Sequence, residues 1–238
     1  MSEKPFIFKE FSVFQDRCAM KVGTDGVLLG AWVSIAPSVD SALDIGTGTG
    51  LIALQLAQRC YAQVIDAVEI ETNAFEQAVE NFENSDWSDR LYCYHASLQK
   101  FKEEIDEKYD LIVSNPPYFN DTFKALTKDR VMARQTSSLS FQELLRISAA
   151  MLSEEGTCAF IIPCGEEENF IKIAAEHGLF PHRITRVRGH DKSPLKRSLL
   201  QLGLRAAVVE INELIIETER HVYTENYKDL VKDFYLKM

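Results

Sequence analysis

The tetrapeptide Asn115-Pro116-Pro117-Tyr118 contains the residue types that most directly suggest chemistry. It follows residues 109–113, an apolar run with the composition of a buried strand. Two prolines cannot continue a sheet, because proline lacks the backbone N–H and fixes φ at about −65°. The strand must therefore end in a rigid turn. The turn holds an amide, the Asn115 side chain, and an aromatic ring, that of Tyr118, which offers a stacking face. An Asx-Pro turn with only a structural role is the alternative.

A glycine-rich loop, Gly46-Thr47-Gly48-Thr49-Gly50, leads directly into a helical pattern at 51–58. Glycines permit positive φ and close approach of a ligand, and the helix N-terminus supplies donors and a positive dipole end. The spacing differs from the Gly-x-Gly-x-x-Gly of dinucleotide sites, and no Gly-Lys-Ser/Thr is present for a triphosphate. Asp44, just before the loop, would repel a pyrophosphate but would suit an ammonium group, as in the methionine part of S-adenosylmethionine. A purely structural tight turn is again the alternative.

Two further strand ends supply candidate contacts to the same ligand. Glu69 ends the second apolar run, where its carboxylate could accept both hydroxyls of a ribose. A structural place in the first turn of the next helix would also explain an acidic residue there. Ser97, after the third run, could reach the amino group of an adenine, and Leu98 and Ile70 could sandwich its ring.

The elements that must position these residues alternate between strand and helix, which predicts a parallel sheet covered on both faces and connected by right-handed crossovers. The later runs 183–188 and 199–209 have no helix between them, and we expect an antiparallel pair that closes the edge of the sheet. The fold class is thus α/β, Rossmann-like, with a mostly parallel, twisted, seven-stranded sheet. The strands are expected at 42–45, 64–68, 91–94, 110–113 and 158–162, and the helices at 51–58, 72–81, 141–152 and 227–236.

The whole chain, 1–238, is expected to form one domain. Within it we distinguish an N-terminal segment, 1–40, a core, 41–182, and a C-terminal part, 183–238, with the antiparallel pair and last helix. No apolar run is long enough to cross a membrane, and the start resembles no signal peptide. We therefore expect a cytoplasmic monomer without a metal, whose five scattered cysteines are reduced.

The net charge of −10 argues against indiscriminate nucleic-acid binding, but it leaves room for a local basic face. Residues 183–205 contain seven Lys or Arg and a single acid, Asp191. A phosphate-binding face and a solvated hairpin explain this run equally well.

Taken together, the glycine loop, the acidic strand ends and the Asn-Pro-Pro-Tyr turn resemble a class I S-adenosylmethionine-dependent methyltransferase. In that superfamily the tetrapeptide marks methyl transfer to a planar exocyclic or amide nitrogen. Residues 20–32, Met-Lys-Val-Gly-Thr-Asp-Gly-Val-Leu-Leu-Gly-Ala-Trp, resemble the signature of the tRNA1(Val) adenine-37 N6-methyltransferase family. The length of the chain and its ending, residues 233–238, match that family too.

This resemblance implies methyl transfer to N6 of adenine 37 in tRNA1(Val), with S-adenosylhomocysteine as the other product. It also implies that Lys21, Thr24, Asp25 and Gly26 close over the cofactor and that Asn115 touches it. Read from the residues alone, Thr24 or Asp25 caps the helix that follows. The family usually has an acidic residue at the position of Ser97, so the bond to the cofactor's adenine is expected to be weaker here.

Two groups of basic residues are expected to hold tRNA phosphates around a flipped-out base. They are Lys124, Arg130 and Arg134, which follow Tyr118, and Lys192, Lys196 and Arg197. The alternative within the same chemistry is a nitrogen methyltransferase acting on rRNA or on a protein glutamine. A non-catalytic binding module would not need Asn115, and a nicotinamide dehydrogenase is disfavoured by the glycine spacing.

Overall fold

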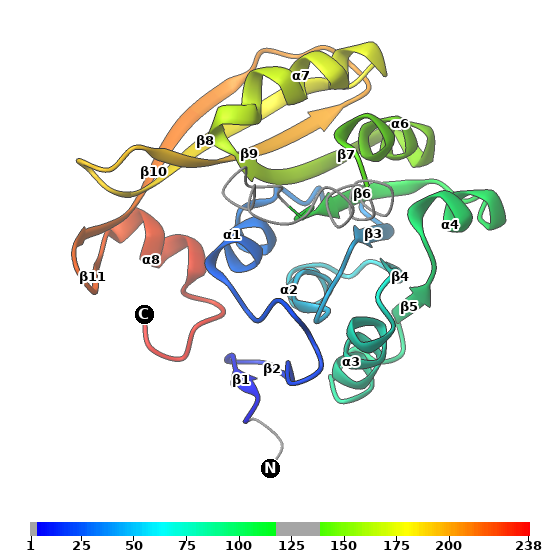
Figure 1. The fold of residues 1–238 in the computed structure, drawn as a ribbon, viewed down its shortest axis with the longest axis horizontal. Helices are drawn as coiled ribbons and strands as arrows, with labels where there is room; N and C mark the ends of the chain where they lie inside the picture. The colour runs from blue at the N-terminus through cyan, green and yellow to red at the C-terminus, as the bar shows by residue number, and fades with distance from the viewer. Residues whose placement is uncertain (1–3, 118–138) are drawn as a thin grey trace, which may run out of the picture.

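The computed structural model describes residues 4–117 and 139–238. A nine-stranded sheet runs through them in the order β11-β10-β8-β9-β7-β6-β3-β4-β5 (Figure 1). Its parallel part consists of β3 (Ser41–Ile45), β4 (Val64–Glu69), β5 (Leu91–His95), β6 (Tyr109–Ser114) and β7 (Leu152–Pro163). The carboxyl ends of these five strands therefore lie along one edge of the sheet.

The rest of the sheet departs from the expected arrangement. β9 (Leu195–Gly203) is antiparallel to both β7 and β8 (Phe180–His190), so it lies inside the sheet. β10 (Glu210–Glu219) runs parallel to β8 and carries the short β11 (Val222–Tyr223). The mostly parallel sheet and the antiparallel pairing of the two runs are confirmed, since β8 and β9 pair antiparallel. The expected number of seven strands and the expected place of this pair at the edge are wrong: nine strands are described, and the edges are β11 and β5. β10 has four glutamates in ten residues, a composition depleted in strands, which hid it in the sequence.

Helices cover both faces of the sheet, as expected. α1 (Thr24–Trp32), α2 (Leu51–Arg59), α3 (Thr72–Glu83) and α8 (Glu225–Val231) pack on one face, and α4 (Leu98–Glu104), α6 (Phe141–Met151) and α7 (Glu167–Glu176) pack on the other (Figure 1). Side chains alternate between the two cores along each strand, so Ala42 faces one core while Leu43 faces the other. A separate hairpin, β1 (Phe6–Ile7) and β2 (Ser12–Val13), lies beside the C-terminal segment, and a 3-10 turn spans Cys164–Glu166.

The start of α1 differs from the sequence-based expectation. Gly23 is the N-cap residue and makes no side-chain bond, while Thr24 is already the first helical residue. The cap assigned to Thr24 or Asp25 is thus wrong. The Asp25 carboxylate instead accepts a hydrogen bond from Nε of Arg197 at 2.7 Å. This ion pair ties the first turn of α1 to β9 across the carboxyl edge of the sheet.

Gly50, at the start of α2, is required for two separate reasons. Its φ is +82°, a conformation that costs other residues energy, and a Cβ there would lie 2.5 Å from Cε1 of Phe82. We expect Gly50→Ala to lower the free energy of unfolding by about 2–4 kcal/mol, as the strain and the overlap add. Chemical denaturation measures this. Gly178→Ala is the matched control, because its φ of +73° brings strain without any overlap. Equal losses in the two variants would contradict the packing role.

Candidate active site

A cavity of about 730 Å³ opens at the carboxyl ends of the parallel strands. This is the edge at which open α/β sheets bind their ligands, and the volume is typical of a small-molecule site. The lining comes from the segment before α1, the ends of β3, β4 and β6, the segments leading into α3 and α4, and the N-terminal part of α6. The expected residues among the lining are Gly46, Gly48, Glu69, Ile70, Ser97, Leu98, Asn115, Pro116 and Pro117.

The glycine loop presents bare backbone to this cavity. Gly46 and Gly48 have φ of +71° and +59°, and a Cβ at either would meet no atom within 4 Å. Open space therefore lies over both residues, as a ligand that approaches the backbone closely requires. The loop is held from below, because the N–H groups of Gly46 and Thr47 donate to the Val68 carbonyl at 2.8 and 3.2 Å. Gly50 does not line the cavity and serves the packing of Phe82.

Asp44 lies behind the loop, outside the residues that line the cavity. It is fully buried, and one carboxylate oxygen accepts from the Thr47 hydroxyl at 2.6 Å and from the Ala53 N–H at 3.2 Å. Its other oxygen, Oδ1, has no hydrogen-bond partner among the described residues. Asp44 thus joins β3, the glycine loop and the first turn of α2.

The burial of Asp44 makes the stability of the protein pH-dependent. Burial raises the pKa of Asp44 to about 7, from the 3.8 of an exposed aspartate. Between these two values the folded state keeps a proton that the unfolded state has lost, so the free energy of unfolding falls as the pH rises from about 4 to 7. Asp44→Asn should flatten this dependence, because it removes a contribution to the free energy of unfolding that changes by at most about 4 kcal/mol over this pH range. Urea denaturation at a series of pH values measures the change. The matched control is Asp110→Asn, since burial raises the pKa of that carboxyl but several hydrogen bonds together outweigh burial and lower it. An unchanged slope in Asp44→Asn would exclude this cause.

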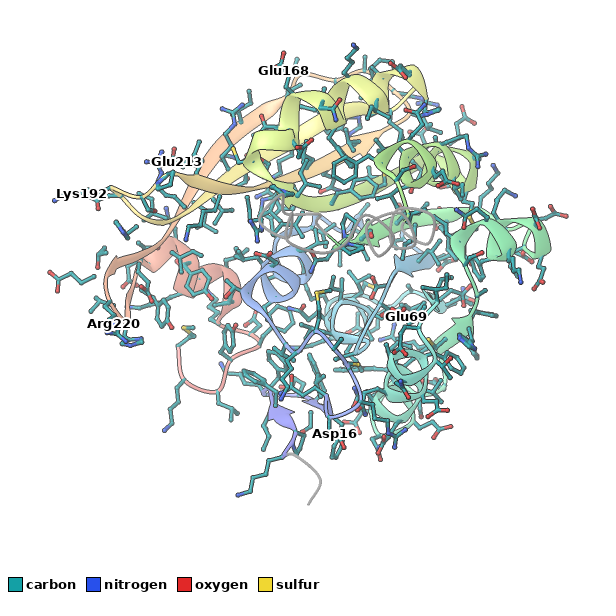
Figure 2. All side chains as sticks on the ribbon, in the orientation of Figure 1. Asp16, Glu69, Glu168, Lys192, Glu213 and Arg220 are labelled. Atoms are coloured by element: carbon teal, nitrogen blue, oxygen red, sulfur yellow. The ribbon has the colours of Figure 1, made fainter. Side chains whose placement is uncertain are left out.

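Glu69 stands at the centre of the loop contacts, at the carboxyl end of β4 (Figure 2). One carboxylate oxygen accepts from the N–H groups of Ile70 and Glu71, and the other accepts from the N–H of Gly48, all at 2.9 Å. The side chain is buried yet lines the cavity. The structural role at the next helix belongs to Glu71, whose carboxylate caps α3 by accepting from the Ala74 N–H at 2.8 Å.

The residues expected around an adenine ring meet in the same cavity. Ile70 is 57% exposed, although it is apolar, and it lines the cavity together with Leu98. Ser97 is the N-cap of α4, and its hydroxyl accepts from the Lys100 N–H at 3.3 Å. The hydroxyl proton stays available for an outside acceptor, but part of the oxygen's acceptor capacity is used.

The turn after β6 forms another wall of the cavity. Asn115, Pro116 and Pro117 all line it, and β6 ends at Ser114, as the prolines predict. Ser114 anchors the turn, because its buried hydroxyl donates to the Ile45 carbonyl at 2.7 Å and so joins the ends of β6 and β3. Tyr118 lies outside the described residues, as do Lys124, Arg130 and Arg134.

The segment before α1 reaches the cavity at other residues than expected. Cys18, Ala19 and Met20 line it, whereas Lys21, Thr24, Asp25 and Gly26 do not. Hydrogen bonds of this segment to two α3 side chains, Asn81 and Gln77, hold it there. A signal was present in the sequence, since Met20 begins the motif at 20–32. Sequence reasoning also missed lining residues on α4 and α6, namely Gln99, Lys100, Glu103 and Glu143.

The basic run is mostly neutralised by the fold. Four of its arginines form ion pairs with carboxylates from other elements: Arg186 with Glu167, Arg188 with Glu213, Arg197 with Asp25, and Arg205 with Glu154 and Glu155. The Arg183 guanidinium stacks on the Trp32 ring, with its Cζ atom 4.6 Å from the ring centroid. Lys192 and Lys196 form no ion pair with any described residue.

Among the described residues, no group of His, Cys, Asp or Glu is arranged to hold a metal ion. None of the described helices is long and apolar enough to cross a membrane. All five cysteines are free thiols.

The order of the parallel strands, the glycine loop and the cavity at the carboxyl edge define a class I, Rossmann-like methyltransferase. A family model described as "Methyltransferase small domain" matches residues 27–162. The fold resembles the crystal structure of a predicted O-methyltransferase from Agrobacterium tumefaciens, with a TM-score of 0.69 and 22% identity over 88% of this chain and 96% of the other.

Curated relatives resolve the family. A tRNA1(Val) (adenine(37)-N6)-methyltransferase of Christiangramia forsetii is 55% identical over the full length of both chains. One from Flavobacterium johnsoniae is 53% identical over 98% of this chain and all of its own. The chain belongs to the tRNA1(Val) (adenine(37)-N6)-methyltransferase family, which confirms the resemblance seen at residues 20–32.

Proposed function

We propose that the protein transfers a methyl group from S-adenosylmethionine to N6 of adenine 37 in tRNA1(Val), and that it acts as a cytoplasmic monomer with the chain working as one domain. Family membership supports the reaction and its substrate. The structural observation that supports methyl transfer is the position of Asn115 and Pro116. Both line the same cavity as the candidate cofactor residues Gly46, Gly48 and Glu69. Acceptors for an amino group and a cradle for a cofactor thus share one space.

The residues of the cavity fit S-adenosylmethionine. The space over Gly46 and Gly48 would take the part of the cofactor next to the loop, and the carboxylate of Glu69 would accept from the ribose. With three backbone N–H groups already bound, this carboxylate has about one acceptor site left, so we assign it one ribose hydroxyl rather than two. Ile70 and Leu98 would hold the adenine ring. Asp44 would act indirectly, through the loop.

The turn after β6 would position the nucleophile. An adenine amino group is a weak nucleophile, because its lone pair is delocalised into the ring. The Asn115 oxygen and the Pro116 carbonyl would accept its two protons, orient the nitrogen and stabilise the positive charge that develops as it attacks. The cofactor, when bound, supplies an electrophilic methyl group on a sulfonium. The prolines keep both acceptors fixed, so little reorganisation is needed at the moment of reaction. Tyr118 would stack on the target base.

The β8–β9 hairpin lies at the carboxyl ends of the parallel strands, which is the side of the sheet from which RNA would have to be contacted. β7 and β8 are both antiparallel to β9, and Arg197 is paired with Pro163 and Val187, near the carboxyl ends of these strands. Residues 191–194 therefore project from the same edge as the Asn115 turn. Figure 2 places Lys192 at the outer end of this hairpin, far from Glu69. We propose that tRNA lies along this edge, with phosphates near Lys192 and Lys196. Arg197, paired with Asp25, would contribute mainly by holding α1.

The double variant Lys192→Gln, Lys196→Gln should weaken tRNA binding, because two phosphate contacts are lost. The slope of log Kd against log salt concentration should fall by about one to two. Filter binding at several salt concentrations measures this slope. Arg205→Gln is the matched control, because Arg205 belongs to the same basic run but follows the end of β9 at the opposite edge. A slope that is unchanged in the double variant would place the tRNA elsewhere.

The proposal is tested by incubating the protein with labelled S-adenosylmethionine and unmodified bulk tRNA, followed by nucleoside analysis. N6-methyladenosine at position 37 of a valine tRNA is the expected product. Labelling of rRNA or of a protein glutamine instead would keep the chemistry of the Asn115 turn and refute the substrate. If tRNA, rRNA and protein all remain unlabelled, the proposed reaction is refuted.

A further inference from the structure

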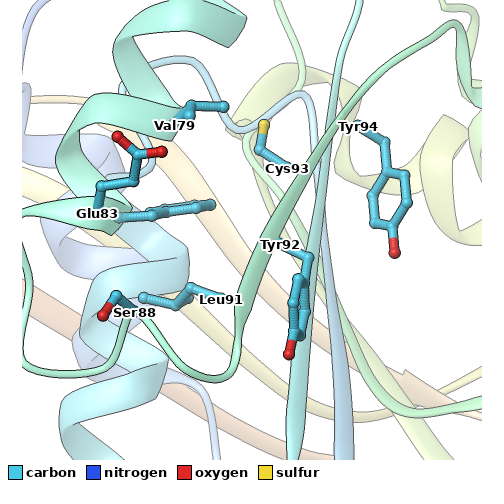
Figure 3. A pocket seen from close by; sticks show the side chains of 8 residues that line it. Val79, Glu83, Ser88, Leu91, Tyr92, Cys93 and Tyr94 are labelled. Carbon is cyan, nitrogen blue, oxygen red and sulfur yellow. The ribbon is translucent and has the colours of Figure 1, made fainter.

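The outer edge of β5, which pairs with no other described strand, borders a groove that shares no lining residue with the cavity at the carboxyl ends of the strands. A cavity of about 330 Å³ lies between β5 and α3, lined by Val79, Phe82 and Glu83 from the helix, by Ser88, and by residues 91–94 of the strand (Figure 3). A second cavity of about 340 Å³ continues along the same helix and shares Val79 and Glu83 with the first. Figure 3 shows Val79 and Glu83 facing the strand from α3.

The backbone of β5 has unused hydrogen-bonding groups on this side. The Ile65 N–H donates to the Arg90 carbonyl, and the Ala96 N–H donates to the Glu69 carbonyl. In a parallel pair, alternate residues face the neighbouring strand, so these two bonds assign the even-numbered residues of β5 to β4. The N–H and C=O groups of Leu91, Cys93 and His95 therefore point outward, where no other described strand pairs with them.

Side chains around this edge provide apolar sites flanked by negative charge. Leu91 and Phe82 are buried, and Cys93 is half-buried, which gives the groove an apolar floor. Tyr92, on the other face of the strand, is 46% exposed. Residues 71–107, which contain the groove, have ten acidic residues and only three basic ones, although Arg17, which lines the second cavity, pairs with Glu76 and Glu80 and neutralises part of this charge. One of the three, Arg90, is turned inward and bound to the carbonyls of Ala57, Cys60 and Ala62.

We propose that this edge binds an extended, cationic segment of a protein partner, which adds to the sheet as a strand beside β5. Its backbone would pair with Leu91, Cys93 and His95, its apolar side chains would enter the groove beside Val79, and a lysine or arginine would meet Glu83. The charge decides between classes of partner. An acidic edge repels RNA phosphates and attracts a basic peptide, whereas Lys192 of the β8–β9 hairpin lies on the far side of the molecule (Figure 2).

The test uses the full-length protein and an acetylated eight-residue peptide of alternating lysine and valine. Amide hydrogen exchange by NMR should show new protection at Leu91, Cys93 and His95 on addition of the peptide. Tyr92 and Tyr94 should change little, because their amides are already bonded to β4. A glutamate–valine peptide and a backbone N-methylated lysine–valine peptide are the ligand controls, and neither should protect these amides.

Glu83→Lys should weaken binding of the lysine–valine peptide by about tenfold, since a favourable charge is replaced by a repulsive one. Glu210→Lys is the matched control, as an exposed acid on β10 at the other end of the sheet. Methylation of tRNA should be the same in both variants, which separates this surface from the active site. Equal binding in Glu83→Lys, no protection at the three amides, or protection by a single-stranded oligonucleotide instead of the peptide would each overturn the proposal.

Discussion

Replacing Asn115 with alanine should lower the rate of methyl transfer at saturating substrates by about 100- to 1,000-fold, the effect of removing one preorganised hydrogen-bonding group from a transition state. The affinity for S-adenosylmethionine should change little, because Gly46, Gly48 and Glu69 remain. Single-turnover methylation gives the rate, and isothermal titration calorimetry gives the affinity. A loss of rate without a loss of binding is the signature of a group that acts on the reacting nitrogen.

Two variants make this result specific. Asn212→Ala removes an exposed asparagine whose side-chain amide donates to Glu210 on the same strand, and this variant should behave as wild type. Asn115→Asp keeps an acceptor oxygen at nearly the same place, and it should retain more activity than Asn115→Ala. If alanine and aspartate were equally inactive, or if cofactor affinity fell in parallel with rate, Asn115 would serve the shape of the turn and not the amino group.

The parallel part of the sheet could be predicted from the sequence because two independent signals coincide there. Runs such as 64–68 and 110–113 are rich in buried apolar residues, and each ends at a residue type that stops a strand or binds a ligand. The C-terminal part lacked these signals. β10 is rich in glutamate, and the run predicted over 199–209 in fact ends as a strand at Gly203. Pairing partners also depend on tertiary contacts, so no local pattern could show that β9 enters the sheet between β7 and β8.

The candidate site was predictable where function depends on the backbone. Gly46, Gly48 and the Asn115 turn line the cavity, as predicted. Their places could be predicted because the backbone conformation there follows from the residue types glycine and proline. Side-chain roles that depend on tertiary contacts were harder to predict from the sequence. Asp44 was expected to face the ligand but is buried behind the loop, and Arg197 was expected to face RNA but pairs with Asp25. Charge in a sequence does not show which charges the fold has already paired.

Glu69 should have the largest effect on cofactor affinity. We expect Glu69→Ala to raise the Kd for S-adenosylmethionine by about 10- to 100-fold, the range of a lost hydrogen bond to a charged group. Two losses combine in this variant. The ribose loses its acceptor, and Gly48 loses the carboxylate that fixes its N–H at 2.9 Å, so the loop that faces the cofactor is no longer tied to β4. Isothermal titration calorimetry with S-adenosylhomocysteine measures the change without turnover.

Glu69→Gln separates charge from shape. Its amide oxygen can still accept from Ile70 and Glu71, but its NH₂ group would face the N–H of Gly48, and two donors cannot bond. We therefore expect Glu69→Gln to bind almost as weakly as Glu69→Ala, although it is nearly isosteric. Glu71→Ala is the matched control from the same cavity. It removes the cap of α3 and should lower the stability slightly, with little change in Kd. Wild-type affinity in Glu69→Gln would show that the carboxylate neither holds the loop nor meets the ribose, and the cofactor would then have to lie elsewhere along the carboxyl edge.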